Sequence, residues 1–343
     1  MSFSIGPISI SNDTEPKIIA ELGINHGGSL DVAKKLASLA IESGADIVKT
    51  QTHLPRLEMS VEAEGRIPGN AELSIFQVIS ENSLSLSDEE DLARFISDAG
   101  GTYLSTPFSR EAADFLFDIG VEGFKIGSGE CNNYPFVDHV ASKGLPVILS
   151  TGMNTISEVE ESVAILKKWK VDFALLHTTN LYPTPTKLLR LGSIQQLMDT
   201  FPGVPIGLSD HSTSNSACLA ATANGASILE RHFTDSRERV GPDIVCSMTP
   251  TELSQLRTMS REIFLALGGD KSSIPEEDVT RNFAFASVAS LKPIRIGEKF
   301  TSENIFPIRP AGGDFPPSAY WSLLGKRARR DIPARKQIGK DDV

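Results

Sequence analysis

Eight short apolar runs, rich in β-branched residues, alternate with amphipathic segments over residues 1–270 of this chain. Such runs are typical of strands buried on both faces of a parallel sheet, and the segments between them have helical spacing. The strands are expected at residues 17–21, 45–51, 101–106, 123–128, 145–151, 172–178, 204–209 and 226–232. Eight β–α units in about 250 residues predict an α/β fold, a (β/α)8 TIM barrel, with a doubly wound open sheet as the alternative.

The pattern changes after the barrel segment. Residues 271–281 are polar and contain a proline, as expected of a linker. Residues 282–343 hold short strand-like pieces separated by turn residues, which predicts a small, mostly β domain. A domain of that size would be marginal alone, so we expect it to pack on the barrel or on a second subunit.

Charge and cysteine usage exclude several classes of function. The 33 basic and 44 acidic residues give a net charge of −11, which does not favour nucleic acid or an anionic membrane as partner. The basic run at residues 326–330 is better explained by a solvated face or a subunit contact. The three cysteines are odd in number and widely spaced, as in reduced proteins, and no signal-peptide or membrane-spanning pattern is present. We therefore expect a cytoplasmic protein with no membrane partner.

Polar side chains end nearly every predicted strand. Because strand ends of a TIM barrel converge on one mouth, they predict a single active site. Lys49 and Lys125 follow apolar strand residues and could be fixed positive charges for an anionic substrate, or they could simply reach solvent at strand ends. Hydrogen bonds to a phosphate and a carboxylate could come from small polar groups nearby, those of Ser128, Ser150, Ser209 and Asn180.

Two histidines and a glutamate add candidate chemistry at the same mouth. His211 and His232 end the seventh and eighth predicted strands, which neighbour each other in a barrel and also carry Asp210 and Glu230. Two imidazoles with oxygen ligands and open positions suit a divalent ion such as Mn²⁺, and structural histidines are the alternative. Glu21 ends the first strand, where it could act as a general base, position a water or pair with a lysine.

A series of motifs in order along the whole chain resembles the bacterial sialic acid synthases. The motifs are IIAELGINHGG, DIVKTQTH, IPGN, LSTPFSREA, FKIGSGECNNYP, LSTGMN, TTNLYPTP, IGLSDHS, ILERHFT and GPDIVCSM. The later stretches FAFASVA and GKRARRDI resemble that family's C-terminal antifreeze-like (SAF) domain. The resemblance implies an enzyme that condenses phosphoenolpyruvate with N-acetylmannosamine and water to give N-acetylneuraminate and phosphate by C–O cleavage.

The resemblance also implies a role for each motif residue. Phosphoenolpyruvate would be held at its carboxylate by Lys49 and Thr106, and at its phosphate by Lys125, Ser128, Ser150, Asn180 and Ser209. A divalent metal, Mn²⁺ before Mg²⁺ or Co²⁺, would be bound by His211 and His232, and Glu21 would serve the water or proton chemistry. The sugar would be contacted by Gln51, Asn70, Tyr182, Asp243, Phe283 and Arg309.

In the family the antifreeze-like domain is swapped, which implies a homodimer in which Arg309 enters the partner's site. The nearest alternative is a legionaminic or pseudaminic acid synthase, which would use a diacetamido hexose at an unchanged phosphoenolpyruvate site. The IPGN and ECNNYP stretches resemble the N-acetylneuraminate type more closely, which ranks N-acetylmannosamine first. A non-catalytic carbohydrate-binding or ice-binding protein is a third alternative, disfavoured by the intact set of charged residues at the strand ends.

Overall fold

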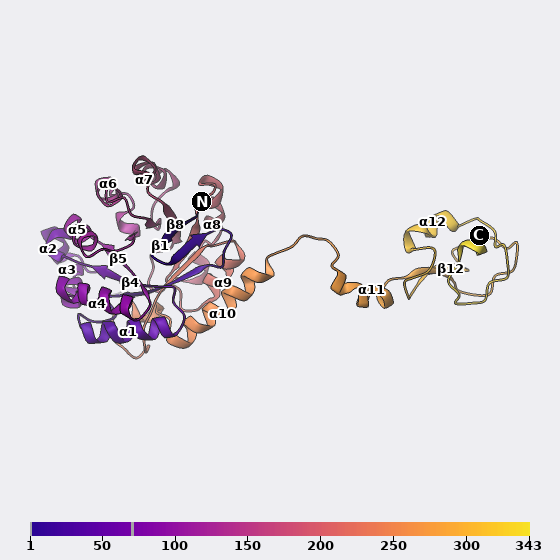
Figure 1. The fold of residues 1–343 in the computed structure, drawn as a ribbon, viewed down its shortest axis with the longest axis horizontal. Coiled ribbons are helices and arrows are strands. Elements are labelled where there is room, and N and C mark those ends of the chain that lie inside the picture. Colours follow the sequence, from indigo (N-terminus) through magenta and orange to yellow (C-terminus); the bar gives the residue numbers. More distant parts are fainter. Residues whose placement is uncertain (1, 70–71) are drawn as a thin grey trace. The chain divides into compact units, whose positions relative to one another are not determined.

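The computed structural model describes residues 2–69 and 72–343, and the chain divides into two compact units, Met1–Gly268 and Gly269–Val343 (Figure 1). Within the described residues, the first unit contains a sheet of eight parallel strands in the order β5-β4-β3-β10-β9-β8-β7-β6. The two strands at the ends of this order, β5 and β6, lie in contact, so the sheet closes into a TIM-like barrel. The predicted fold class is therefore confirmed.

The observed strands overlap the predicted ones. They are β3 (Lys17–Gly23), β4 (Ile47–Thr52), β5 (Thr102–Pro107), β6 (Phe124–Ile126), β7 (Val147–Ser150), β8 (Phe173–Thr178), β9 (Ile206–Asp210) and β10 (Ile228–His232). Most predictions start one or two residues early, and the fourth also ends late. There the chain leaves the sheet after Ile126 and forms a 3-10 turn over Ser128–Glu130.

Helices surround the strands (Figure 1). The helices of the barrel are α1 (Leu30–Glu42), α4 (Leu86–Asp98), α5 (Arg110–Asp118), α6 (Tyr134–Ala141), α7 (Ile156–Trp169), α8 (Gly192–Thr200), α9 (Ser216–Ala223) and α10 (Pro250–Ala266). Side chains fix where they begin: Ser29 caps α1, and α7 starts with a capping box between Thr155 and Glu158. The connection from β4 to α4 is long and contains the short helices α2 (Pro55–Glu58) and α3 (Ile75–Asn82).

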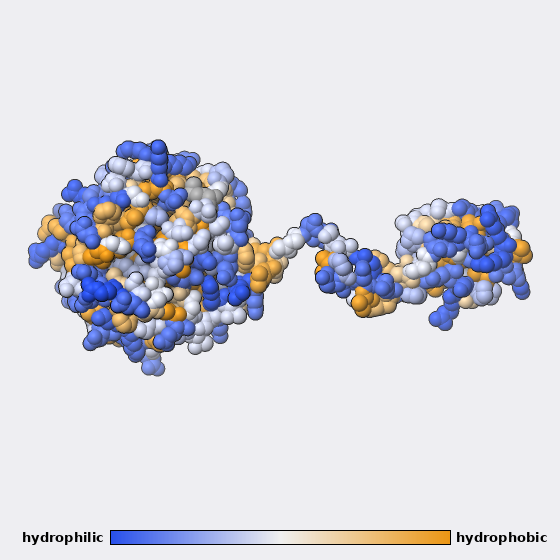
Figure 2. All heavy atoms as spheres, in the orientation of Figure 1, coloured by the Kyte–Doolittle hydropathy of each residue, from blue (hydrophilic) through white to orange (hydrophobic). Residues whose placement is uncertain are grey.

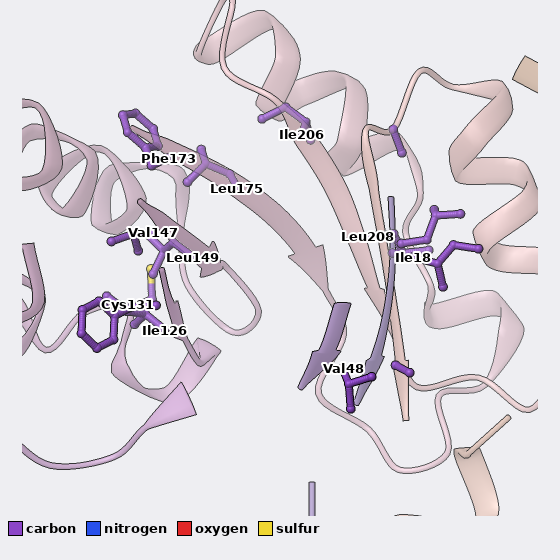
Figure 3. Close-up of a cluster of buried hydrophobic side chains, with 14 of the residues drawn as sticks. Ile18, Val48, Ile126, Cys131, Val147, Leu149, Phe173, Leu175, Ile206 and Leu208 are labelled. Atoms are coloured by element: carbon purple, nitrogen blue, oxygen red, sulfur yellow. The ribbon is translucent and has the colours of Figure 1, made fainter. Parts of the chain in front are cut away.

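The barrel has two apolar layers. On the outer face of the strands, Ile18, Val48 and Leu208 belong to the cluster that packs against the helices (Figure 3). Inside the barrel, Ile19 and Ile47 belong to a second cluster, which also contains side chains from a hairpin of β1 (Ser2–Ile5) and β2 (Ile8–Ser11). This hairpin was not predicted, and it packs on the interior layer that precedes the polar strand ends.

The second unit is small and contains an antiparallel sheet, as predicted, together with short helices that were not predicted. It contains the antiparallel pair β11 (Ser287–Ser290) and β12 (Ile305–Ile308), with the short helices α11 (Asp278–Ala284) and α12 (Tyr320–Leu323). Val288, Phe300 and Ile332 are among the residues of its own buried cluster. Hydrophilic and hydrophobic residues are interspersed on the visible surface of each unit (Figure 2). Among the described residues, no helix combines the length and apolar character needed to cross a membrane.

Candidate active site

A polar cavity of about 140 Å³ lies at the C-terminal ends of the barrel strands. Its position follows from strand alternation, because side chains two residues apart face the same way. Ile19 and Ile47 face the interior apolar layer, and Glu21 and Lys49, two residues further along, face the cavity. The predicted site residues that line it are Glu21, Lys49, Gln51, Thr106, Lys125, Ser128, Ser150, Asn180, Tyr182, Ser209, His211 and His232.

Four buried charged groups form the floor of this cavity. Lys49 and Glu21 are ion-paired, as their opposite positions in the β3–β4 register allow. Oε1 of Glu230 lies 3.7 Å from Nζ of Lys49 and 3.9 Å from Nζ of Lys125. The four side chains are 7% exposed or less. A ligand that enters here meets two desolvated cations, whose attraction for an anion is stronger than it would be in water.

Burial and the neighbouring charges shift the pKa values of these groups in different directions. Burial lowers the pKa of Lys125 to about 8, although Glu230 opposes the shift. Burial alone would raise the pKa of Glu230, but the Lys125 and Lys49 cations lower it. Burial raises the pKa of Glu21 to about 7, against the effect of Lys49. Glu230 is thus held as a carboxylate, whereas Glu21 can exchange a proton near neutral pH.

Neutral hydrogen-bonding groups surround the two lysines. Lys125 donates a 2.6 Å hydrogen bond to Oγ of Ser150, and Lys49 donates a 3.1 Å hydrogen bond to Oγ1 of Thr106. Oδ1 of Asn180 is buried without a hydrogen-bond partner among the described residues. A buried polar atom left unpaired is costly, so this oxygen indicates a place for a ligand or a water.

The backbone of Gly152 packs against two side chains that line the cavity, Ser128 and Asn180. Its N–H donates a 3.0 Å hydrogen bond to Oγ of Ser128. A Cβ atom at this position would lie 1.9 Å from Oδ1 of Asn180, so only glycine lets the chain pass so close to these two side chains. The backbone therefore fixes the spacing between two predicted phosphate ligands.

His211 and His232 lie together, with their ring centroids 5.4 Å apart, and Tyr182 stacks on His211 at 4.1 Å. Nδ1 of His211 lies 3.1 Å from the carbonyl oxygen of Thr179 and donates to it, which leaves Nε2 with a free lone pair. Nδ1 of His232 is buried without a hydrogen-bond partner in the described part of the chain. Burial lowers the pKa of His211 to about 4 and that of His232 to about 3. Both rings are thus neutral.

Two neutral imidazoles with free nitrogens fit a divalent metal ion. Asp243 adds a carboxylate nearby, with Oδ2 3.8 Å from Nδ1 of His232, and burial raises its pKa to about 6. The described residues contain no group of three or more His, Cys, Asp or Glu side chains arranged around one point. Metal binding by the two histidines stays a prediction, in which water or a substrate oxygen would have to complete the coordination.

Two predicted site residues belong to the second unit. Phe283 lies on α11 with 59% of its surface exposed, and Arg309 follows β12 and is exposed. Their entry into a cavity stays a prediction. Asn70 lies outside the described residues.

Strand alternation separates two carboxylates that the sequence analysis placed beside the histidines. Glu230 stands two residues before His232, so it faces the cavity; it was not proposed as a site residue, although this spacing could have identified it. Asp210 immediately precedes His211 and faces the other way, where its Oδ2 lies 3.3 Å from Nε of the fully buried Arg231. Phe108, at the end of the STPF motif, is a further lining residue that the analysis missed.

Comparison with known proteins gives consistent matches over both units. Residues 36–272 match the model of the NeuB family, and residues 285–343 match that of the SAF domain. The chain is 36% identical to the N,N'-diacetyllegionaminic acid synthase of Campylobacter jejuni over 92% of this chain and 96% of the relative. It is 34% identical to the enzyme of the same name from Legionella pneumophila, over 92% of this chain and 91% of that relative.

A solved structure gives a similar result. The N-acetylneuraminic acid (sialic acid) synthetase of Leptospira borgpetersenii, crystallised with citrate, has 32% sequence identity and a TM-score of 0.73. The match covers 82% of this chain and 95% of that one.

Proposed function

This chain belongs to the NeuB family, and we propose that it condenses phosphoenolpyruvate with a 2,4-diacetamido sugar and water to give a nonulosonic acid and phosphate. The cavity floor carries the proposal: two buried lysines face hydroxyl and amide groups beside two neutral histidines. Both N,N'-diacetyllegionaminic acid synthases among the relatives support the diacetamido sugar. N-acetylmannosamine, ranked first from the motifs, is the second candidate and is supported by the Leptospira structure.

Phosphoenolpyruvate has two anionic groups, which could each pair with one of the two lysines in the floor. Its phosphate would take the Lys125 side, where Ser128, Ser150, Asn180 and Ser209 supply uncharged hydrogen bonds. Its carboxylate would take the side of Lys49 and Thr106, which are already hydrogen-bonded to each other. Holding both anionic groups fixes the enol carbon in one position, and such positioning can supply several kcal/mol of the barrier reduction.

The bond changes then balance as follows. Carbon 3 of phosphoenolpyruvate attacks the aldehyde carbon of the open-chain sugar and forms the new C–C bond, and the aldehyde oxygen takes up a proton. Water adds to carbon 2 and supplies the proton taken up by the aldehyde oxygen. The remaining hydroxyl then becomes the carbon 2 carbonyl as the C–O bond to phosphate breaks, and its proton leaves with the phosphate. A divalent ion, Mn²⁺ in our proposal, would be held by His211 and His232 and would polarise the aldehyde oxygen as a Lewis acid.

Glu21 is placed to handle a proton in this sequence. Its carboxyl group lines the cavity beside Lys49, and burial raises its pKa to about 7. A group with this pKa can accept a proton from the attacking water and return it at neutral pH. The sugar would be contacted by Gln51 and Tyr182, which line the cavity, and by Asp243, which lies near His232.

Phosphate release from phosphoenolpyruvate tests the function. The full chain with Mn²⁺ should release phosphate with a 2,4-diacetamido sugar, more slowly with N-acetylmannosamine, and not without sugar or with excess chelator. Release with N-acetylmannosamine alone would move the protein to the N-acetylneuraminate branch. No release with any sugar would reject the enzyme and favour the non-catalytic carbohydrate-binding alternative.

We also propose that the chain works as a swapped homodimer in which Arg309 serves the partner's barrel. Co-expressing an Arg309→Ala chain with a His211→Ala chain tests this arrangement. In a swapped mixed dimer, the intact barrel receives the intact arginine, so activity should reappear although each variant alone is impaired. If the mixed dimers stay as inactive as the single variants, the swap is wrong.

A further inference from the structure

A hydrogen-bonded chain from Glu58 to Gln51 lies directly behind the cavity wall. Its central member, His53, has a side chain that is 3% exposed and does not line the cavity. His53 instead contacts two residues that do. Its ring stacks on Phe108, with centroids 4.3 Å apart and planes inclined by 15°, and its Nε2 lies 3.0 Å from Oε1 of Gln51.

Glu58 anchors the other side of the ring. Its Oε1 lies 2.8 Å from Nδ1 of His53, and its Oε2 accepts a 3.1 Å hydrogen bond from the backbone N–H of Leu54. The Glu58 side chain is only 5% exposed, so these partners replace the water that it would otherwise bind. Glu58 ends α2, in the long connection after β4, and thereby ties this connection to the strand that carries Gln51.

The two ring nitrogens of His53 face oxygen atoms of different side chains. Nδ1 faces Oε1 of Glu58, and Nε2 faces Oε1 of Gln51. An amide oxygen accepts hydrogen bonds, so in this arrangement Nε2 donates to Gln51. The ring is thus fixed on one side by Glu58 and orients the Gln51 amide on the other.

We propose that Glu58 and His53 are positioning residues that set which end of the Gln51 amide faces the sugar. In the observed arrangement the Gln51 oxygen is taken by Nε2 of His53, and the Gln51 NH₂ group remains to donate to an oxygen of the sugar. Without this contact the amide could turn and present its oxygen instead. This inference rests on the proposed function, because it takes Gln51 as a sugar ligand.

The test is a double-mutant cycle on the full chain. Glu58→Gln keeps the shape but removes the carboxylate that fixes Nδ1 of His53, so the ring and the Gln51 amide should lose their fixed orientation. We expect the KM for the sugar to rise roughly three- to tenfold, the loss of about one hydrogen bond, while kcat and the KM for phosphoenolpyruvate stay unchanged. In a Gln51→Ala background, Glu58→Gln should have no further effect, because the side chain through which it acts is gone.

Controls separate positioning from folding. Glu64→Gln neutralises an exposed carboxylate in the same connection and should leave all constants unchanged. His53→Gln keeps an uncharged donor within reach of Gln51 and should largely preserve the sugar KM, whereas His53→Leu should raise it. This pair provides the test even if Glu58→Gln unfolds, which a thermal melt would reveal.

The outcomes distinguish this inference from the proposed function. An unchanged sugar KM in Glu58→Gln and His53→Leu, or an effect of Glu58→Gln that persists in the Gln51→Ala background, would overturn the positioning role. The wild-type enzyme would still release phosphate in both cases. If the wild type releases no phosphate with any sugar, the proposed function fails first, and this inference fails with it.

Discussion

Nζ of Lys125 lies 3.9 Å from Oε1 of Glu230, and the two side chains are only 3% and 7% exposed. Burial lowers the pKa of Lys125 to about 8, so the cation is present below that pH and is lost above it. We expect kcat/KM for phosphoenolpyruvate to fall as the pH rises through about 8. In Glu230→Gln the fall should begin at lower pH, because the carboxylate that opposes the shift is gone.

Steady-state kinetics from neutral to alkaline pH check this prediction. Lys125→Arg is the control, because a guanidinium keeps its charge over the whole pH range. The activity that remains in this variant should not fall at alkaline pH. Identical alkaline limbs in the wild type and Glu230→Gln would show that Lys125 does not govern binding of the anion.

Removal of either cavity histidine should weaken metal binding. His211→Ala and His232→Ala each lose one nitrogen donor, and we expect each to reduce the affinity for Mn²⁺ at least tenfold. Because burial holds the two pKa values at about 4 and about 3, the wild-type affinity should persist into mildly acidic solution. Isothermal titration of the full chain measures both effects without any turnover.

The matched control for the metal site is His139→Ala. His139 lies on α6 and pairs with Asp114 at 2.8 Å, away from the cavity lining. Its removal should leave Mn²⁺ binding intact. Unchanged affinity in both cavity variants would mean that the histidine pair is structural.

Gly152→Ala should damage the phosphate side of the cavity. The new Cβ would lie 1.9 Å from Oδ1 of Asn180 and 2.8 Å from Oγ of Ser128, so both side chains must move. We expect the KM for phosphoenolpyruvate to rise by about tenfold or more, with a smaller effect on the sugar. Gly192→Ala serves as the control, because no described atom outside its own chain neighbours lies within 4 Å of a Cβ there. Equal kinetics for the two variants would contradict the close approach.

Arg231→Met should destabilise the barrel strongly. Arg231 is 1% exposed, and it pairs with Asp210 and donates to Oδ1 of Asn215 at 2.6 Å. Its loss leaves the Asp210 charge buried without its partner, which typically costs about 3–5 kcal/mol of the free energy of unfolding. Urea unfolding measures the loss. In the Arg231→Met background, Asp210→Asn should reduce the free energy of unfolding by less than it does in the wild type. If the two losses simply add, the two side chains are not coupled.

Periodicity made most of the barrel predictable, because strands buried on both faces have a distinctive apolar pattern. The hairpin of β1 and β2 was missed, although its strands alternate serine with apolar residues, because each strand has only four residues. In the site, motif residues on strand ends were found together, whereas Glu230 was named beside the histidines but given no role, and Asp210 was placed with them although it faces the other way. Counting residues in twos from His232 would have assigned Glu230 to the cavity, and counting from His211 would have placed Asp210 on the opposite face.

The contacts made by the long connections could not be predicted from the sequence. His53 could be placed at a strand end, but its partner Glu58 lies on a four-residue helix inside the connection after β4. No period in the sequence fixes the position of such a helix, because its place is set by hydrogen bonds and packing that form only in the folded chain. The parts played by Asn70, Phe283 and Arg309 remain predictions.

In the described part of the chain, the hairpin of β1 and β2 packs against the interior apolar layer of the barrel. Ile5 and Ile10 are fully buried there, together with the isoleucines of the strands. Such a close-packed layer is a poor path for a polar molecule. In the proposed reaction, released phosphate and the product would therefore leave through the mouth by which the substrates enter. Departure of the last product is therefore a condition for the next cycle to begin.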